Sequence, residues 1–387
     1  MASTRTETSG MRIGVAGAGR IGTMHATNLA TLDEVDEVLL FDPAPGRAAQ
    51  ASALLPGSRS VDDLDALLTD SDGVLLATPT TTHPSLLRAT IAAGVPTLCE
   101  KPIASHLDEM RALVDDVEAS GVEVLVGFQR RFDPAVSELH RRVREGDVGD
   151  VYLVRALGND ARPPDFSYLP QSGGIFRDLL IHDLDAVPWL VGEPVVEVYA
   201  SGSVLVDPAF AEADDVDNAV VLLKFAGGAH AVLAGGRHDP LGYDHRIEVL
   251  GSRDSLAVGL DPRTPLTSLE PDGPKAAGDA YPGFAERFHR AYLAEVAAFT
   301  RVVAGAAANP SPVRESLVSL LLAEACERSR RSGAPVRVDA GARWSSGADP
   351  SSAGASPIGV GPVPDGRLPG ASVATPEAGH SNTGVVA

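Results

Sequence analysis

The stretch "MRIGVAGAGRIG" (11–22) constrains the fold of this chain more than any other segment. Its first half is a short apolar run of the kind that forms a buried strand. The run continues directly into three glycines spaced as G-x-G-x-x-G, and a helical pattern follows over 20–31. A strand, a tight turn and a helix in direct succession begin a βαβ unit, which belongs to a parallel sheet.

The residues after this turn repeat the alternation of strand and helix. Strands are predicted at 11–17, 37–42, 73–78, 96–100 and 123–128, and helices at 20–31, 47–55, 85–94 and 107–120. Such alternation predicts a parallel, doubly wound sheet with helices on both faces. We therefore expect an α/β domain of the Rossmann type over 11–128.

The rhythm changes after Phe128. Strands are predicted at 151–157, 194–205, 218–225, 229–236, 245–251 and 255–260, and helices at 134–145, 175–185, 284–304 and 313–332. Strands that follow one another with turn signals predict an α+β domain with an open, mostly antiparallel sheet, here over 129–340. The segments 1–10 and 341–387 hold few large apolar groups and are predicted to be disordered.

Composition excludes several classes of protein. The net charge of −20 argues against a nucleic-acid partner, because phosphate binding needs a basic surface. No apolar run approaches the roughly 20 residues of a membrane span. The start "MASTRTETSG" lacks the apolar core of a signal peptide, so we expect a cytoplasmic protein. Cys99 and Cys326 lack metal-ligand spacing and are expected to be buried thiols.

The glycine turn matches the fingerprint of dinucleotide-binding domains. Gly17 would form the tight turn, Gly19 would let a pyrophosphate approach the backbone, and Gly22 would let helix and strand pack closely. Asp42 ends the second strand, twenty residues after Gly22. A carboxylate there accepts hydrogen bonds from the ribose of NAD and repels the extra phosphate of NADP. NAD is therefore the predicted cofactor; the alternative is another glycine-rich turn, with Asp42 a solvated strand end.

Five motifs, taken together, resemble those of the Gfo/Idh/MocA oxidoreductase family. They are "GAGRIGTMHATN" (17–28), "TPTTTHP" (78–84), "CEKPIA" (99–104), "GFQRRFDP" (127–134) and "SGGIFRDLLIHDLD" (172–185). With "YDHRIEVLG" (243–251), the later motifs look most like those of inositol 2-dehydrogenases. The resemblance covers about residues 11–335. It implies oxidation of a ring alcohol, here myo-inositol to its 2-ketone, with NAD(P), in a cleft between two domains of a homotetramer.

The resemblance also assigns residues by position. Lys101, Asp178 and His182 fall on the family's catalytic positions. The residues expected to bind substrate are Lys101, Asn159, Asp178, His182, Asp185 and Tyr243. Those expected to contact the cofactor are Gly17, Gly19, Arg20, Ile21, Gly22, Asp42, Thr78, Pro79, His83, Glu100 and Lys101.

Elementary chemistry supports these roles. Oxidation of an alcohol needs a base for the hydroxyl proton, and histidine suits that task because its pKa lies near neutrality. His182 is the predicted base. Asp178, one turn earlier on the predicted helix, would orient the imidazole or stabilise its charged form, and the Lys101 ammonium would stabilise the developing alkoxide.

Several alternatives stay open at this point. Asp178 and His182 can form a self-satisfied pair in the core. A metal site formed by Asp178, His182 and Asp185 would need further ligands, and no histidine or cysteine cluster supplies them, so no metal is predicted. Asp185 can bind a substrate hydroxyl or close a polar cluster. His83 can pack at a helix start, and Tyr243 can lie at an interface.

Some positions depart from the family pattern. His245 stands where inositol dehydrogenases often have glutamine, and Asn159 lies in a segment that replaces an arginine-containing one. The substrate therefore stays open between inositol and another cyclic polyol or aldose. A non-catalytic NAD-binding regulator is the alternative of another class, although a regulator needs no base. Arg130 and Arg131 are predicted as a solvated pair, with a substrate or interface element as the alternative.

Overall fold

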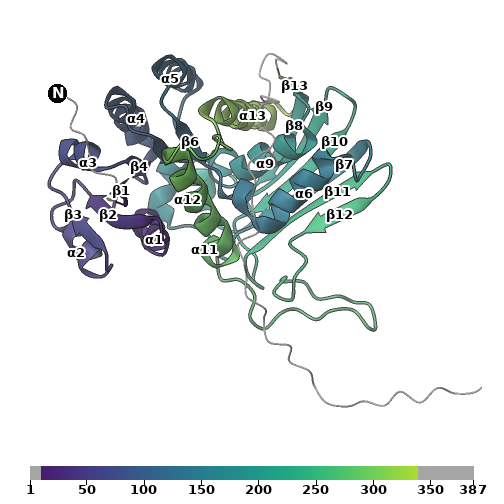
Figure 1. Cartoon of the computed structure of the whole chain (residues 1–387). Helices are drawn as coiled ribbons and strands as arrows, with labels where there is room; N and C mark the ends of the chain where they lie inside the picture. The colour runs from purple at the N-terminus through teal and green to yellow at the C-terminus, as the bar shows by residue number, and fades with distance from the viewer. Residues whose placement is uncertain (1–9, 339–387) are drawn as a thin grey trace, which may run out of the picture. The chain divides into compact units, whose positions relative to one another are not determined.

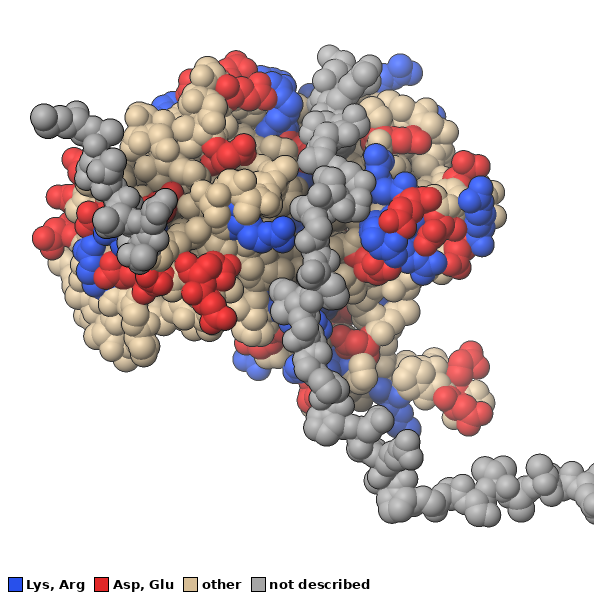
Figure 2. Space-filling model, in the orientation of Figure 1, with Lys and Arg blue, Asp and Glu red and all other residues tan. Residues whose placement is uncertain are grey.

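A computed structural model of the chain describes residues 10–338, which are built around two β-sheets (Figure 1). Nearly all of the predicted disordered N-terminus and the whole predicted tail, 341–387, lie outside the described residues. None of the helices between residues 10 and 338 is long and apolar enough to cross a membrane. On the face drawn in Figure 2, acidic and basic side chains form scattered patches among other residues.

Sheet A contains six parallel strands in the order β3-β2-β1-β4-β5-β6. These strands are β1 (Met11–Ala16), β2 (Val35–Phe41), β3 (Ser58–Ser60), β4 (Gly73–Leu76), β5 (Thr97–Glu100) and β6 (Val124–Gly127). The helices between them are α1 (Arg20–Leu29), α2 (Arg47–Ala53), α3 (Leu64–Asp70), α4 (His83–Ala92) and α5 (Leu107–Ser120). The predicted doubly wound Rossmann sheet is confirmed. Strand β3 and helix α3 were not predicted; β3 gave no clear signal because its sequence, "SRS", is short and polar.

Helices cover both faces of sheet A. One face packs against α3, α4 and α5, and the other packs against α1, α2 and α12 (His289–Val303). Figure 1 shows α12 beside α1, although the two are far apart in the sequence. Phe299 of α12 is fully buried in this layer. A helix from the second half of the chain thus completes the cover of the first sheet.

The strand order of sheet A fixes where a ligand can lie. The chain leaves β1 toward β2 on one side, whereas β4 lies on the other side. At such a switch point the loops diverge and open a crevice outside the carboxyl ends of the strands. The glycine turn follows β1, "TPTTTHP" follows β4 and Lys101 follows β5. The fold therefore brings three of the predicted motifs to one edge.

Sheet B has seven strands in the order β12-β11-β7-β10-β9-β8-β13, and β7–β10 is its one parallel pair among the described residues. The strands are β7 (Val151–Asn159), β8 (Val195–Ser203), β9 (Asn218–Phe225), β10 (His230–Gly236), β11 (Asp244–Gly251), β12 (Ser255–Val258) and β13 (Val336–Arg337). The predicted open, mostly antiparallel sheet is confirmed, including the hairpin between β11 and β12.

One face of sheet B forms the second core. Strand β9 alternates strictly: Val221 and Leu223 are buried, whereas Val220 and Leu222 on the opposite face are exposed. The inner face packs against α6 (Pro134–Arg144), α9 (Ile181–Val191) and α13 (Val313–Ser332). The remaining short helices are η1 (Thr80–Thr82), η2 (Gln129–Phe132), η3 (Phe166–Tyr168), α7 (Leu169–Ser172), α8 (Ile175–Asp178), α10 (Ala209–Glu212) and α11 (Phe284–Arg287).

The single helix predicted over 175–185 is wrong. The helix is interrupted at Leu179 and Leu180, between α8 and α9. The amide of Leu180 donates to the carbonyl of Ile175 at 2.8 Å, which makes the turn one residue wider than an α-helical turn. Both leucines are buried, so the wide turn directs two consecutive apolar side chains inward. Asp178 and His182 consequently do not share one regular helical stripe.

Candidate active site

The glycine turn is built so that two of its glycines allow no other residue. Gly17 has φ +99°, and a Cβ there would lie 2.5 Å from the carbonyl oxygen of Ala77. A Cβ on Gly22 would lie 1.7 Å from the carbonyl oxygen of Gly17, so α1 packs directly on the turn. A Cβ on Gly19, at the start of α1, would meet no atom within 4 Å. The turn is therefore tight on the protein side and open where a pyrophosphate would approach.

Asp42 ties the end of β2 to this turn. Its Oδ2 accepts a hydrogen bond from the amide of Ala18 at 2.9 Å, and its Oδ1 accepts one from the amide of Ala44 at 2.8 Å. Nη1 of Arg47 lies 3.4 Å from Oδ1, and the Arg47 side chain is 56% exposed. Each carboxylate oxygen has two lone pairs, so accepting one amide leaves capacity for a ribose hydroxyl. The sequence did not reveal that Asp42 also holds the glycine turn in place through its hydrogen bond with Ala18.

His83 joins two loops at the crevice. Its Nε2 lies 2.8 Å from the carbonyl oxygen of Thr78, and its Nδ1 lies 2.9 Å from that of Pro102. The ring is 1% exposed, and burial lowers its pKa. The imidazole is therefore neutral and donates to one carbonyl at a time. Its contact with the cofactor stays a prediction, whereas its geometry shows a fastening between the loops that follow β4 and β5.

Lys101, which follows β5 of sheet A, contacts Asp178 of α8, which lies beside sheet B. Nζ of Lys101, after β5, donates to the backbone carbonyl of Asp178 at 3.0 Å and lies 3.8 Å from its Oδ1. The Tyr168 hydroxyl donates to Oδ1 at 3.2 Å, and Nη2 of Arg237 lies 2.9 Å from Oδ2. Burial disfavours the charged carboxylate, but Lys101 and Arg237 outweigh it and lower the pKa of Asp178. Asp178 is therefore ionised between two cations.

His182 lies on α9, with its ring edge-on to Phe128 at 6.2 Å between centroids. Burial, followed by the positive charges of Lys101 and Arg130, lowers the pKa of His182 well below its usual range. The imidazole is thus neutral at pH 7 and able to accept a proton. Among residues 10–338, Asp178 has hydrogen-bond or ion-pair contacts with Lys101, Tyr168 and Arg237, and none with His182. The break between α8 and α9 accounts for the separation of their roles.

The two arginines of "GFQRRFDP" are buried, so the prediction of a solvated pair is wrong. Arg130 is 1% exposed and forms an ion pair with Asp183 on α9. His245 contributes to this cluster, because its Nε2 lies 3.5 Å from Oδ1 of Asp183. Burial lowers the pKa of His245 to about 4, so it is neutral as well. Burial raises the pKa of Tyr243 to about 12, and that phenol stays protonated beside Arg130.

Arg131 lies in a second closed cluster. Its Nε and Nη2 bond both oxygens of Asp185 at 2.8 and 2.7 Å, and its Nη1 bonds Glu315. Ser319 donates to the same Asp185 carboxylate at 3.1 Å, and Asp185 is fully buried. This corrects the substrate assignment of Asp185: its carboxylate closes a polar cluster and lies away from solvent. The pairing joins η2, α9 and α13.

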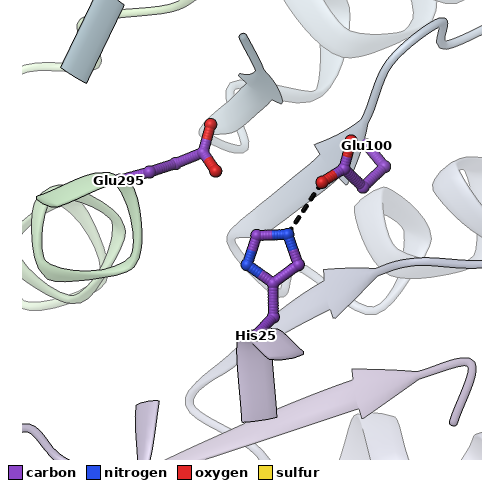
Figure 3. A group of neighbouring side chains, drawn as sticks. All are labelled: His25, Glu100 and Glu295. Carbon is purple, nitrogen blue, oxygen red and sulfur yellow. Dashed lines mark hydrogen bonds and ion pairs between the residues drawn. The ribbon is translucent and has the colours of Figure 1, made fainter. Parts of the chain in front are cut away.

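His25, Glu100 and Glu295 form a third polar cluster (Figure 3). Nε2 of His25, on α1, lies 2.7 Å from Oε1 of Glu100, and the amide of Lys101 donates to Oε2 of Glu100 at 3.2 Å. Glu295 of α12 points toward this pair, is fully buried, and has no hydrogen-bond partner for either oxygen among the described residues. Ligand atoms of the three side chains lie within 4.8 Å of one another.

The buried Glu295 carboxyl needs either a proton or a cation. An ionised carboxylate without a partner costs several kcal/mol to bury. Burial and the nearby Glu100 raise the pKa of Glu295 well above its usual range, which favours the proton. We therefore interpret Glu295 as a neutral carboxylic acid. His25, Glu100 and Glu295 are the residues in the described part of the chain that are placed to hold a metal ion if one were bound.

Replacing Glu295 by glutamine tests this interpretation. A raised pKa in the folded state means that the native protein retains a proton that the unfolded chain loses above about pH 4.3. The free energy of unfolding of the wild type then falls by up to about 1.4 kcal/mol per pH unit as the pH rises toward the folded-state pKa. Glu295→Gln should match the wild type near pH 4.5 and become increasingly more stable toward pH 9 in thermal unfolding. A Gln variant that is less stable at alkaline pH would indicate an anion held by a bound cation.

Comparisons with known proteins agree with this geometry. The profile described as "Oxidoreductase family, NAD-binding Rossmann fold" matches residues 11–128, and the GFO/IDH/MocA C-terminal domain matches residues 136–257. The chain is 40% identical over 330 residues to the myo-inositol dehydrogenase Hyg17 of Streptomyces leeuwenhoekii. The aligned region covers 84% of this chain and 98% of that protein.

Solved structures share the whole two-sheet arrangement. A putative myo-inositol dehydrogenase from Sinorhizobium meliloti superimposes with a TM-score of 0.78 at 32% identity, covering 84% of this chain and 99% of the other. A scyllo-inositol dehydrogenase from Lactobacillus casei, solved with bound NAD(H) and scyllo-inositol, superimposes with a TM-score of 0.76 at 25% identity, covering 85% of this chain and 99% of the other.

Proposed function

The chain belongs to the Gfo/Idh/MocA oxidoreductase family, and on that premise we propose that it is an NAD-dependent inositol 2-dehydrogenase. The observation that carries the proposal is the contact of Lys101 with Asp178, which joins the nucleotide-binding edge of sheet A to the helix α8 beside sheet B. The similarity to inositol dehydrogenases extends over nearly their full length and supports inositol as the substrate. The reaction converts a ring secondary alcohol to a ketone.

The crevice fits NAD. Gly19 leaves open space at the start of α1, and Asp42 is held at the end of β2 with acceptor capacity for a ribose. When bound, NAD supplies the hydride acceptor at its nicotinamide ring. The backbone around Thr78 and Pro79, together with Arg20 and Ile21 of α1, would line the cofactor site.

The side chains divide the remaining work. His182 is neutral and takes the hydroxyl proton as general base. The Lys101 ammonium donates to the substrate oxygen and stabilises its developing negative charge. Asp178 accepts from a further hydroxyl and holds Lys101 in place. Tyr243 and Asn159 contact other ring hydroxyls, since both lie at the ends of sheet B strands around the same edge.

Assembly through sheet B is part of the proposal. Its outer face exposes Tyr199, Val220 and Leu222, with Val220 52% exposed. Apolar side chains gathered on one face of a sheet mark an interaction surface. We assign this surface to copies of the same chain in a homotetramer, and light scattering of the purified protein measures that assembly directly.

A substrate panel tests the function. Purified protein is mixed with NAD or NADP and with myo-inositol, scyllo-inositol, other inositol isomers, glucose and other aldoses, and reduced cofactor is followed by absorbance. We expect turnover on an inositol that exceeds turnover on every aldose. A preference for aldoses would favour the alternative cyclic substrate, to which His245 in place of glutamine points. Cofactor binding without turnover on any polyol would indicate a non-catalytic regulator.

The preference for NAD over NADP rests on the Asp42 carboxylate, which would repel a 2′-phosphate. Asp42→Asn removes this charge and frees the adjacent Arg47 to pair with phosphate. We expect kcat/KM for NADP relative to NAD to rise on the order of tenfold, which corresponds to about 1.4 kcal/mol. The double variant Asp42→Asn with Arg47→Gln is the matched control and should lose most of that gain. An unaltered ratio in Asp42→Asn would remove Asp42 from its role in cofactor selection.

A further inference from the structure

Arg237 is a buried cation in the candidate site, and none of the sequence motifs indicated it. Its side chain is 2% exposed and lies immediately after β10. Nη2 lies 2.9 Å from Oδ2 of Asp178, and Nη1 donates to Oδ2 of Asp160 at 3.2 Å. An arginine this deeply buried is stable only with its charge neutralised, and here two carboxylates share that task.

The parallel pairing of β7 and β10 explains why Arg237 reaches this position. Asn159 and Gly236 are partners at the ends of the two strands, so the next residues, Asp160 and Arg237, emerge side by side. The amide of Asp160 donates to the carbonyl of Gly236 at 2.9 Å, which extends the pairing by one residue. The amide of Arg237 donates to the carbonyl of Asp217 at 2.8 Å and fixes the other flank. Backbone bonds therefore hold Arg237 independently of its guanidinium contacts.

The result is an alternating row of four charges, defined here as the charge row: Lys101, Asp178, Arg237 and Asp160. Neighbours in the row have opposite sign and lie 3.8, 2.9 and 3.2 Å apart in that order. The row runs from the carboxyl edge of sheet A to the strand ends of sheet B. Burial alone would favour a neutral carboxyl at Asp178, and its two positive neighbours in the row counter this effect.

We propose that Arg237 is a positioning residue for the dehydrogenase reaction: it keeps Asp178 ionised and oriented, so that Asp178 in turn fixes the Lys101 ammonium against the substrate oxygen. This inference rests on the proposed function and adds a residue to it. Arg237 acts through Asp178 and takes part in no proton or hydride step. Asp160 neutralises the side of the Arg237 guanidinium that faces away from Asp178. The guanidinium therefore does not pair with Asp178 alone.

The groups that interact with Asp178 come from four elements. Lys101 follows β5, Tyr168 lies in η3, Arg237 follows β10 and Asp160 follows β7. Burial raises the pKa of Asp178, whereas Lys101, Arg237 and the hydrogen bond from Tyr168 lower it. Removing Arg237 leaves burial opposed by Lys101 and Tyr168, so Asp178 takes up a proton at higher pH. A purely structural arginine would give no such shift in the pH dependence of turnover.

The test compares Arg237→Gln, Arg237→Lys and Asp160→Asn with the wild type on the best inositol substrate. Arg237→Gln should lower kcat by about 100-fold, the loss that misplacement of a reacting group by about 1 Å can cause. Its acid limb of kcat should move to higher pH, while the dissociation constant of NADH stays unchanged. Arg237→Lys should recover part of kcat and return the limb toward its wild-type position. Asp160→Asn should leave the limb where it is or move it to lower pH.

Controls separate folding from function. Arg88→Gln on α4 removes an exposed ion pair with Asp116 and should leave both kcat and the pH profile unchanged. Thermal unfolding reports any loss of fold in each variant. Wild-type turnover with an unshifted acid limb in Arg237→Gln overturns the inference and leaves the proposed function intact. Absence of inositol turnover in the wild type overturns the proposed function itself, before any variant is compared.

Discussion

The contact between the Lys101 ammonium and the backbone carbonyl of Asp178 is the interaction on which the rest of the site depends. It joins the strand ends of a nucleotide-binding sheet to a helix beside the second sheet. The break after α8 makes the contact possible, because a continuous helix would use that carbonyl for the amide of residue 182. One irregular turn thus leaves a backbone carbonyl free to accept a hydrogen bond from the Lys101 ammonium, the cation that we propose acts in catalysis.

Burial then sets the charge of each group around this contact. His182 is neutral because burial and the positive charges of Lys101 and Arg130 lower its pKa. Asp178 is charged because two cations outweigh the same desolvation. A neutral imidazole and a lysine side chain are the groups that the proposed proton abstraction and alkoxide stabilisation require. Behind them, Glu295 keeps its proton because it faces Glu100 without a hydrogen-bond partner in the described structure.

Much of the fold follows from local signals in the sequence. The G-x-G-x-x-G turn, the strand–helix alternation and the later run of strands each depend on residues a few positions apart, so the two sheets were predictable. The helix break at Leu179 was not predictable, because the helical pattern of the sequence continues through it. Only the packing of both leucines in the folded protein reveals the break. Arg237 was hidden for another reason. Its neighbour Asp160 is 77 residues away, and only the parallel pairing of β7 with β10 brings them together. The available sequence signal for the burial of Arg130 and Arg131 was their position between the apolar Phe128 and Phe132. Their charge alone suggested exposure to solvent.

The most direct test of this account is the pH dependence of inositol oxidation by the wild type and by His182→Ala. The account predicts that kcat/KM of the wild type stays level below the ordinary histidine pKa of about 6.5, since the buried base resists protonation. It predicts that His182→Ala binds NADH as the wild type does but loses roughly 10³-fold in kcat, within the range of a general base. A variant that turns over inositol at the wild-type rate, with the wild-type pH profile, would contradict the assignment of His182 as the base.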